Sequence, residues 1–158
     1  ASAQGFLITG TNSGNTSSSG SSTAAYNHLL FYNGNGIVGS ISTSGSATTY
    51  STSSDYRLKE NISDMTDGIE RVKKLQPKKF SFLANPDKEI VDGFLAHEVK
   101  DLVPQSVLGE KDAVDEDDNP IMQTINVSTL IPVLTGALKE AIAKIETLEA
   151  KVTALENT

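Results

Sequence analysis

The sequence predicts an α+β protein in three parts, and three observations support this division. Residues 1–54 contain no Asp, Glu, Lys or Arg, so the 20 acidic and 13 basic residues all lie in 55–158. Short apolar runs flank Asn-Gly turns in the uncharged segment, and an apolar heptad pattern ends the chain. We therefore predict a β-rich segment over 1–53, a small α+β unit over 54–127 and a coiled-coil helix over 128–158.

The overall composition excludes several classes of protein. The chain has no cysteine, which excludes a disulfide scaffold, a thiolate metal site and a cysteine nucleophile. A net charge of −7 argues against nucleic acid as the main partner. No apolar run approaches the ~18–20 residues that cross a bilayer, so no membrane insertion is expected. The first residues include neither an initiator Met nor a signal-like segment, which predicts a piece of a longer protein.

The uncharged segment is rich in small polar residues, because 35 of its 54 residues are Ser, Thr, Gly or Asn. A flexible linker is one interpretation of that composition. Strand-like runs at residues 5–10, 29–32 and 37–41 favour an ordered β structure, and the last two flank an Asn-Gly hairpin signal. Ser44-Gly45 predicts a further turn. A single hairpin is marginally stable in water, so we expect its apolar residues to pack against identical copies of the chain.

Helical and strand patterns alternate in the charged segment. Ile69, Val72 and Leu75 have helical spacing, and Pro77 ends the helix. We expect strands at 79–83, 89–96 and 121–125, and a short helix at 97–103.

An acidic run at residues 110–118 contains alternating oxygen-bearing side chains, as calcium loops do. It lacks the central Gly and the distal Glu of an EF-hand loop, so we expect a solvated turn before Pro120. His97-Glu98 lacks the second His of a zinc-protease helix. We therefore predict neither a metal site nor another cofactor.

The C-terminal residues predict one long helix with a continuous apolar seam. Ser128 is the expected N-cap, and Pro132 lies in the first turn, where a missing N–H costs least. Eight apolar residues occupy every a and d position of four heptads, as in a coiled coil. The a positions are Ile131, Leu138, Ile145 and Val152, and the d positions are Leu134, Ala141, Leu148 and Leu155.

Charges beside the seam indicate how the helices associate. Each g-position lysine precedes an e-position glutamate by five residues: Lys144 with Glu149, and Lys151 with Glu156. This spacing favours a parallel homo-oligomer, although each exposed pair contributes only a few tenths of a kcal/mol. β-Branched residues at a with Leu at d favour two strands, and Leu138 and Ala141 depart from that rule. One amphipathic helix packed on its own domain is the alternative.

A serine and a lysine lie close together where the composition changes. A serine hydroxyl needs a base to become a nucleophile. Lys59 could be that base for Ser54 if burial, or a neighbouring cation such as Arg57, favoured its neutral amine. On spacing alone, a surface loop is the simpler interpretation.

The whole segment from Ser54 to Ile62 is a more specific signal of function than the Ser54–Lys59 pair alone. Ser54-Asp55-Tyr56-Arg57-Leu58-Lys59-Glu60-Asn61-Ile62 resembles the motif that opens the C-terminal intramolecular chaperone domain of phage tailspikes, tail fibres and endosialidases. Residues 92–99 with Val103-Pro104 resemble the second block of that family of self-cleaving serine peptidases. Residues 128–132 resemble its third block. The resemblance covers roughly residues 37–156.

The resemblance implies a homotrimer that cleaves itself between Ser53 and Ser54, with Ser54 as the nucleophile and Lys59 as the base. His97 occupies the position of a polar residue that some members need for cleavage, so catalytic support and structural hydrogen bonding both stay open. Further motif positions are expected to orient the site: Asp55, Arg57, Asn61 and Glu98. Whether Lys59 acts within its own chain or on a neighbouring chain stays open as well.

The implied function is to trimerise and fold an upstream fibre and then to leave it. The expected partners are the chain's own copies and that fibre, with host receptors bound only by other parts of the full protein. Assembly is expected in the host cytoplasm, with the upstream part retained in the virion tail and residues 54–158 released. Two alternatives are a trimerisation domain without enzymatic activity and a receptor-binding tip within residues 1–54.

Overall fold

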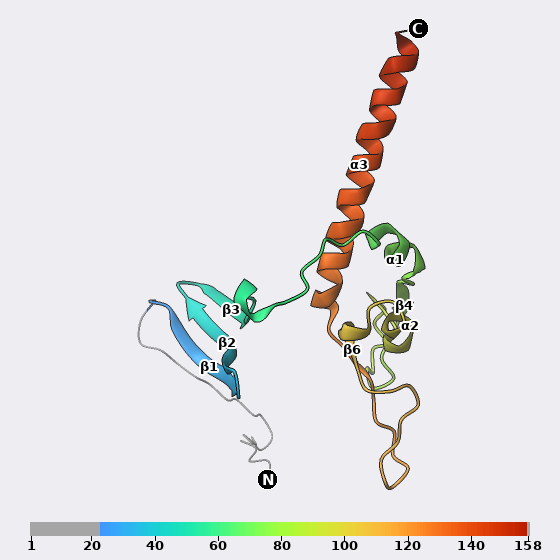
Figure 1. The fold of residues 1–158 in the computed structure, drawn as a ribbon. Helices are drawn as coiled ribbons and strands as arrows, with labels where there is room; N and C mark the ends of the chain where they lie inside the picture. The colour runs from blue at the N-terminus through green and yellow to red at the C-terminus, as the bar shows by residue number, and fades with distance from the viewer. Residues whose placement is uncertain (1–22, 158) are drawn as a thin grey trace. The chain divides into compact units, whose positions relative to one another are not determined.

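A computed structural model of the chain describes residues 23–157. The chain forms two compact units that divide between Ile62 and Ser63 (Figure 1). The first contains a β-sheet and the second mixes helices with short strands, so the predicted α+β class is confirmed. The predicted strand at residues 5–10 lies outside the described residues.

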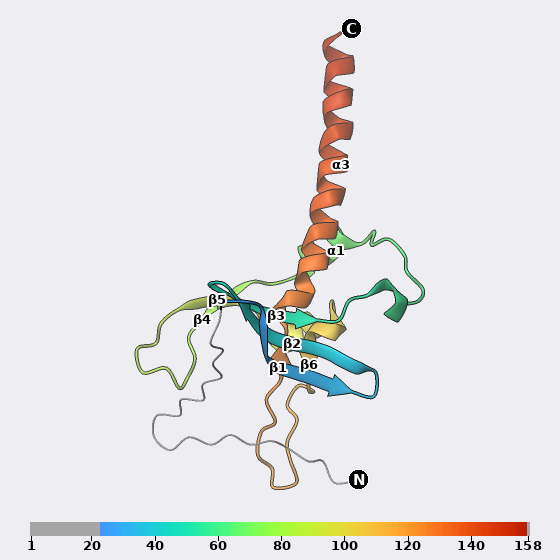
Figure 2. The same cartoon turned by 90° about the vertical axis from the view of Figure 1, so that its left-hand side faces the viewer.

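The first unit contains a three-stranded antiparallel sheet in the order β1-β2-β3 (Figure 2). Its strands are β1 (Tyr26–Asn33), β2 (Gly36–Ser44) and β3 (Ala47–Thr52). The hairpin predicted around the Asn-Gly turn is confirmed, with Gly36 at φ 92°. The predicted turn at Ser44-Gly45 joins β2 to β3. The sequence analysis did not identify β3, because its Ser and Thr residues resemble the linker composition around it.

The sheet leaves its large side chains exposed. No residue between 23 and 62 is buried. Seven large apolar or aromatic side chains of the three strands are between 39% and 77% exposed: Tyr26, Leu29, Leu30, Phe31, Tyr32, Ile37 and Tyr50. A sheet that buries so little apolar surface gains little stability from the hydrophobic effect. This agrees with the expectation that one copy cannot fill a core here.

The second unit places short strands among helices and 3₁₀ turns. Along the chain these are α1 (Gly68–Lys74), β4 (Lys78–Phe80), β5 (Val91–Gly93), α2 (Ala96–Lys100), η2 (Pro104–Ser106), β6 (Val107–Leu108), β7 (Thr124–Ile125), η3 (Val127–Leu130) and α3 (Ile131–Glu156). The helices expected before Pro77 and Pro104 are confirmed.

The strands of the second unit are shorter than predicted. β4 and β5 form an antiparallel pair of three residues each, and β6 pairs with β7 over two. The predicted strand 79–83 stops at Phe80, because a turn begins at Leu83. The predicted strand 89–96 keeps only Val91–Gly93, because Ala96 begins α2. Alternation of apolar residues marked the positions of these strands but not their ends.

A small apolar core holds the second unit together. Its buried members are Val99, Val103, Val107, Leu130 and Val133, from α2, the turn after it, β6, η3 and α3. Burying each such side chain contributes roughly 1.5–3 kcal/mol. Partly buried residues of α1 and β7 pack around this cluster. The second unit therefore has a core of its own.

Helix α1 lies unusually close to α3. A Cβ atom on Gly68 would overlap the backbone nitrogen of Ala137, so the contact requires a glycine. Glu140 completes the contact, because its carboxylate accepts hydrogen bonds from the backbone N–H groups of Gly68 (2.7 Å) and Ile69 (3.2 Å). A carboxylate at a helix N-terminus satisfies N–H groups that have no partner within the helix.

The long C-terminal helix is confirmed as α3 and extends well beyond the rest of its unit (Figure 1). The predicted N-cap at Ser128 is wrong, because η3 forms first and the side chain of Asn126 accepts a hydrogen bond from the Ser128 backbone N–H at 3.1 Å. Helix α3 begins at Ile131 with no side-chain cap. Pro132 lies in its first turn, as predicted.

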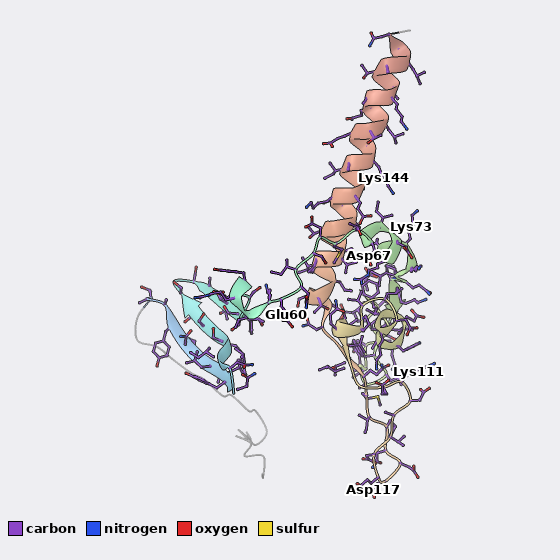
Figure 3. All side chains as sticks on the ribbon, in the orientation of Figure 1. Glu60, Asp67, Lys73, Lys111, Asp117 and Lys144 are labelled. Carbon is purple, nitrogen blue, oxygen red and sulfur yellow. The ribbon has the colours of Figure 1, made fainter. Side chains whose placement is uncertain are left out.

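The acidic run forms an exposed turn with Asp117 at its tip (Figure 3). Val114 and Pro120 form a β-bridge across it. Asp115 closes the turn by accepting hydrogen bonds from the backbone N–H groups of Asp117 and Asn119, each at 2.9 Å. Hydrogen bonds from the Asn119 backbone and side chain, followed by the Asp117 N–H, lower the pKa of Asp115. The predicted solvated turn before Pro120 is therefore present.

Candidate active site

The structure brings Ser54 and Lys59 together within one chain. Lys59 Nζ lies 2.7 Å from Ser54 Oγ and 3.2 Å from the backbone oxygen of Ser54. An extended segment of five residues would span up to ~17 Å, so the contact depends on the intervening fold. That fold is the 3₁₀ turn η1 (Tyr56–Leu58), which lies between the two residues.

Asp55 and Arg57 stabilise this turn. Asp55 Oδ1 accepts a hydrogen bond from the Arg57 backbone N–H at 2.9 Å, which caps η1. The same carboxylate pairs with the Arg57 side chain through Nε and one terminal nitrogen, both at 2.9 Å. The Arg57 side-chain hydrogen bond, its backbone hydrogen bond and then the charge of Lys59 lower the pKa of Asp55, and Asp55 raises that of Arg57.

The pairing with Asp55 changes the role considered for Arg57. The guanidinium group is already matched by a carboxylate, so it is not an uncompensated cation beside Lys59. Ser54 and Lys59 are both exposed in the single chain. Burial is the remaining means of favouring a neutral lysine amine, and the turn alone does not provide it.

Ser53, on the other side of the predicted cleavage bond, is attached to the sheet. Its backbone N–H donates to the Val38 carbonyl at 3.0 Å, and its hydroxyl donates to the Ile37 carbonyl at 3.1 Å. Both acceptors belong to β2. The sequence analysis identified Ser53 as a cleavage residue but did not foresee these contacts, because they join positions about fifteen residues apart.

Asn61 follows the turn with a left-handed backbone, at φ 52°. Asparagine adopts this conformation more readily than most residues other than glycine. The residue therefore suits a change of chain direction shortly after Lys59, and its orienting role stays a prediction.

His97 and Glu98 lie on α2 in the second unit. The side chain of His97 lines an open pocket of about 650 Å³ together with Lys100, Glu110 and other polar residues. Glu98 Oε1 lies 3.5 Å from Lys78 Nζ, and its Oε2 atom is buried without a hydrogen-bond partner. Ser54 and Lys59 belong to the other unit, so a role of His97 or Glu98 in cleavage stays a prediction.

The predicted seam forms an exposed apolar stripe along α3. Its large side chains are all more than half exposed: Ile131, Leu134, Leu138, Ile145, Leu148, Val152 and Leu155. Ala141 is half-buried. The helix instead buries Val133 and Ala137, which lie on a different face. This argues against the alternative in which the seam packs on its own domain, because another face performs that packing.

Within residues 23–157, no three or more His, Asp or Glu side chains are grouped so that they could hold a metal ion. Over the same range, no helix combines the length and the apolar character that a membrane crossing requires.

The sequence analysis missed Glu140 and its contact with the start of α1. Glu140 is a c position of the heptad and lies about seventy residues from Gly68 in sequence. Local patterns cannot reveal such a contact. The only available signal was a glycine immediately before the apolar-periodic residues of α1.

Comparison with known proteins identifies part of the chain. No curated protein matched it. Residues 54–108 match the model of the peptidase family described as chaperone of endosialidase. The match begins at Ser54, the predicted nucleophile, and includes Lys59, His97 and Glu98. The resemblance seen in the motif is thereby confirmed over residues 54–108, which match the chaperone-of-endosialidase family.

Proposed function

We propose that this chain is an intramolecular chaperone that trimerises an upstream phage fibre and then releases itself by cleaving the Ser53–Ser54 bond. The family match supports the chaperone role. The observation that most favours cleavage is the 2.7 Å contact between Lys59 Nζ and Ser54 Oγ, in a segment whose family match begins at Ser54.

The contact has the geometry of a nucleophile and its base. In the proposed reaction, the neutral amine of Lys59 takes the Ser54 hydroxyl proton while Oγ attacks the carbonyl carbon of Ser53. The carbon–nitrogen bond then breaks, and the Lys59 ammonium returns the proton to the departing amine of Ser54. The resulting ester joins Ser53 to Ser54 Oγ. Water hydrolyses it, which leaves a carboxylate on Ser53 and a free amine and hydroxyl on Ser54.

The turn geometry favours Lys59 acting on the serine of its own chain. Association of several chains would then be needed for another reason, which is to exclude water from η1. A lysine amine accepts a proton only in its neutral form, and burial favours that form. Both residues are exposed in one chain, so packing between chains would activate the pair. This would couple cleavage to assembly.

The seam of α3 is the proposed assembly surface, and its partners are further copies of the same chain. Large contiguous apolar surfaces on soluble proteins are commonly interaction sites. The predicted Lys–Glu pairs lie C-terminal to Val133 and Ala137, and Lys144 lies on the part of α3 that extends beyond its own unit (Figure 3). Lys144 of one helix would face Glu149 of the next in a parallel arrangement. The number three follows from the family resemblance.

The chaperone role follows from what assembly does for the sheet. Three copies joined at the coil hold their sheets at high local concentration. Strand pairing between distant segments is slow and favours aggregation, and a preformed trimer shortens the search. We place this assembly in the host cytoplasm, with the upstream part kept in the virion tail and residues 54–158 released.

The proposal is tested by intact mass measurement and N-terminal sequencing of the purified protein. The wild-type chain should yield fragments 1–53 and 54–158, the second beginning at Ser54. Ser54→Ala and Lys59→Ala should both remain whole, because each removes one half of the pair. Both should still form trimers, which light scattering measures.

Two control variants replace a serine and a lysine that lie outside the candidate site. Ser46→Ala changes an exposed serine in the turn between β2 and β3, and Lys73→Ala changes an exposed lysine on α1 (Figure 3). Both should be cleaved like the wild type. Cleavage of the Ser54→Ala chain at the same bond would disprove the nucleophile assignment. A wild-type trimer that stays whole would favour a trimerisation domain without enzymatic activity.

A further inference from the structure

The predicted cleavage bond joins two residues that are held by different parts of the fold. Ser53 follows the last residue of β3 and is tied to β2 through the carbonyls of Val38 and Ile37. Ser54 has left the sheet, and its hydroxyl is held by Lys59 at the end of η1. The bond therefore lies where the sheet ends and the turn begins.

The two contacts of Ser53 control different parts of the residue. The hydrogen bond from its backbone N–H extends the β2–β3 pairing one residue beyond Thr52, which pairs with Gly39. The hydrogen bond from its hydroxyl fixes the side chain against the same strand. Together they restrict the backbone of Ser53 and so the direction of its carbonyl group.

We propose that Ser53 is a positioning residue, and that its hydrogen bonds to β2 make cleavage depend on β2–β3 pairing. This inference deepens the proposed function and requires it. Lys59 and η1 orient the attacking oxygen, while β2 orients the carbonyl that it attacks. Reaction between two groups is fast only when both are held in the productive geometry.

The exposed position of Ser53 makes this arrangement conditional. An exposed strand end frays readily when its neighbouring strand is not formed, because few contacts hold it. In that state the carbonyl of Ser53 would sample many directions, and attack by Ser54 would be slow even with Lys59 in place. Cleavage would then occur only in chains whose upstream sheet has folded.

The first test changes the hydroxyl of Ser53 alone. Ser53→Ala removes the hydrogen bond to Ile37 and should slow cleavage about fivefold, the rate equivalent of one hydrogen bond of roughly 1 kcal/mol. Ser53→Thr keeps a hydroxyl and suits an extended backbone, so it should restore most of the rate. A time course of fragment formation after refolding from denaturant measures each rate, with the trimer fraction measured in parallel.

The second test disturbs β2–β3 pairing without touching Ser53. A Cβ atom on Gly39 would lie 2.9 Å from the backbone oxygen of Ser51, so Gly39→Ala pushes β3 away from β2. This shift should slow cleavage roughly tenfold or more, because small displacements of reacting groups have large effects on rate. The matched control is Gly34→Ala in the β1–β2 turn, where a Cβ atom meets nothing within 4 Å.

The outcomes separate this inference from the function on which it depends. It is supported if Ser53→Ala and Gly39→Ala form trimers but are cleaved slowly, while Ser53→Thr and Gly34→Ala resemble the wild type. It is wrong if the trimeric Ser53→Ala and Gly39→Ala chains are cleaved at the wild-type rate. If the wild-type chain itself is not cleaved, the proposed function fails first.

Discussion

The two units of this chain differ in what they can bury. Residues 23–62 have no buried residue, although the sheet presents Leu, Ile, Phe and Tyr side chains. The second unit has much shorter strands but buries a cluster of valines and Leu130 against α3. The regular sheet therefore lacks a core, and the irregular unit has one.

This difference indicates an order of folding. The second unit gains hydrophobic stability within a single chain, whereas we expect the sheet to gain it against further copies. In the proposed assembly, the exposed seam of α3 would bring those copies together, because another face of the helix packs on its own unit. Under the proposed function, the second unit would fold first and then guide the sheet.

Tyrosine offers a way to observe the two units separately. All four tyrosines lie between residues 26 and 56, and the chain has no tryptophan. Tyrosine fluorescence therefore reports on the first unit alone. Far-ultraviolet circular dichroism of helices reports mainly on the second unit, which contains α3.

The largest effect should come from breaking the seam. Leu148→Asp places a charge in the predicted interface, where Leu148 would contribute roughly 1.5–3 kcal/mol when buried in each chain. The protein should become monomeric and stay whole at Ser53–Ser54. Its tyrosines should become solvent-exposed, while the helical signal should fall only in part, because the second unit keeps its core.

The matched control for the seam is Ala150→Asp. Ala150 lies two residues away on α3, at heptad position f, and faces away from the predicted interface. This variant should trimerise and be cleaved as the wild type is. A trimeric Leu148→Asp protein would contradict the assigned seam, and rapid cleavage of a proven monomer would contradict the coupling of cleavage to assembly.

A smaller effect is expected from disturbing the second unit itself. Gly68→Ala should lower the free energy of unfolding by about 2–3 kcal/mol, because the new methyl group overlaps the backbone of α3. Gly136→Ala, on the other side of this contact, meets only the flexible end of Met65 at 2.9 Å. It should be neutral or stabilising, since alanine favours a helix interior by about 1 kcal/mol over glycine.

Thermal unfolding followed by circular dichroism distinguishes these two glycine variants. The helical signal of Gly68→Ala should be lost at a lower temperature than that of Gly136→Ala. Equal midpoints would mean that α1 does not hold its close approach to α3. The second unit would then depend on its valine core alone.

The sequence predicted those parts of the fold in which local patterns decide the structure. The Asn-Gly hairpin, the helix before Pro77 and the long helix after Pro132 each have signals within a few residues. Sequence reasoning failed where distant residues decide. β3 forms because β2 lies beside it. The error at Ser128 was local, because Asn126, two residues earlier, caps the turn that displaced the expected N-cap.

The candidate site shows the same contrast between residues that the sequence identified and contacts that only the structure revealed. Ser54, Lys59, Asp55 and Arg57 lie within six residues, and the motif resemblance identified all of them. The pairing of Arg57 with Asp55 needed the structure, because either residue could have contacted other groups. The attachment of Ser53 to β2 needed it too, since no local pattern predicts a hydrogen bond between residues 37 and 53.

The smallest expected effect concerns Asp55, in the turn between the sheet and the second unit. Asp55→Asn keeps an oxygen that can cap η1 but loses the charge that holds the Arg57 side chain. We expect cleavage to slow about threefold, and Asp55→Ala, which loses both contacts, to slow it about tenfold. Trimer formation should not change, because the residue is distant in sequence from the seam.

The pH dependence makes this prediction more specific. The Arg57 hydrogen bonds lower the pKa of Asp55 below its ordinary value of 3.8, so the charged pair is fully present above that value. Its contribution is lost only as the pH falls through the lowered pKa. The ratio of wild-type to Asp55→Asn cleavage rates should therefore stay constant from pH 5 to pH 9, even if both rates change. A ratio that varies within this range would mean that Asp55 acts on the ionisation of Lys59 and does more than shape the turn.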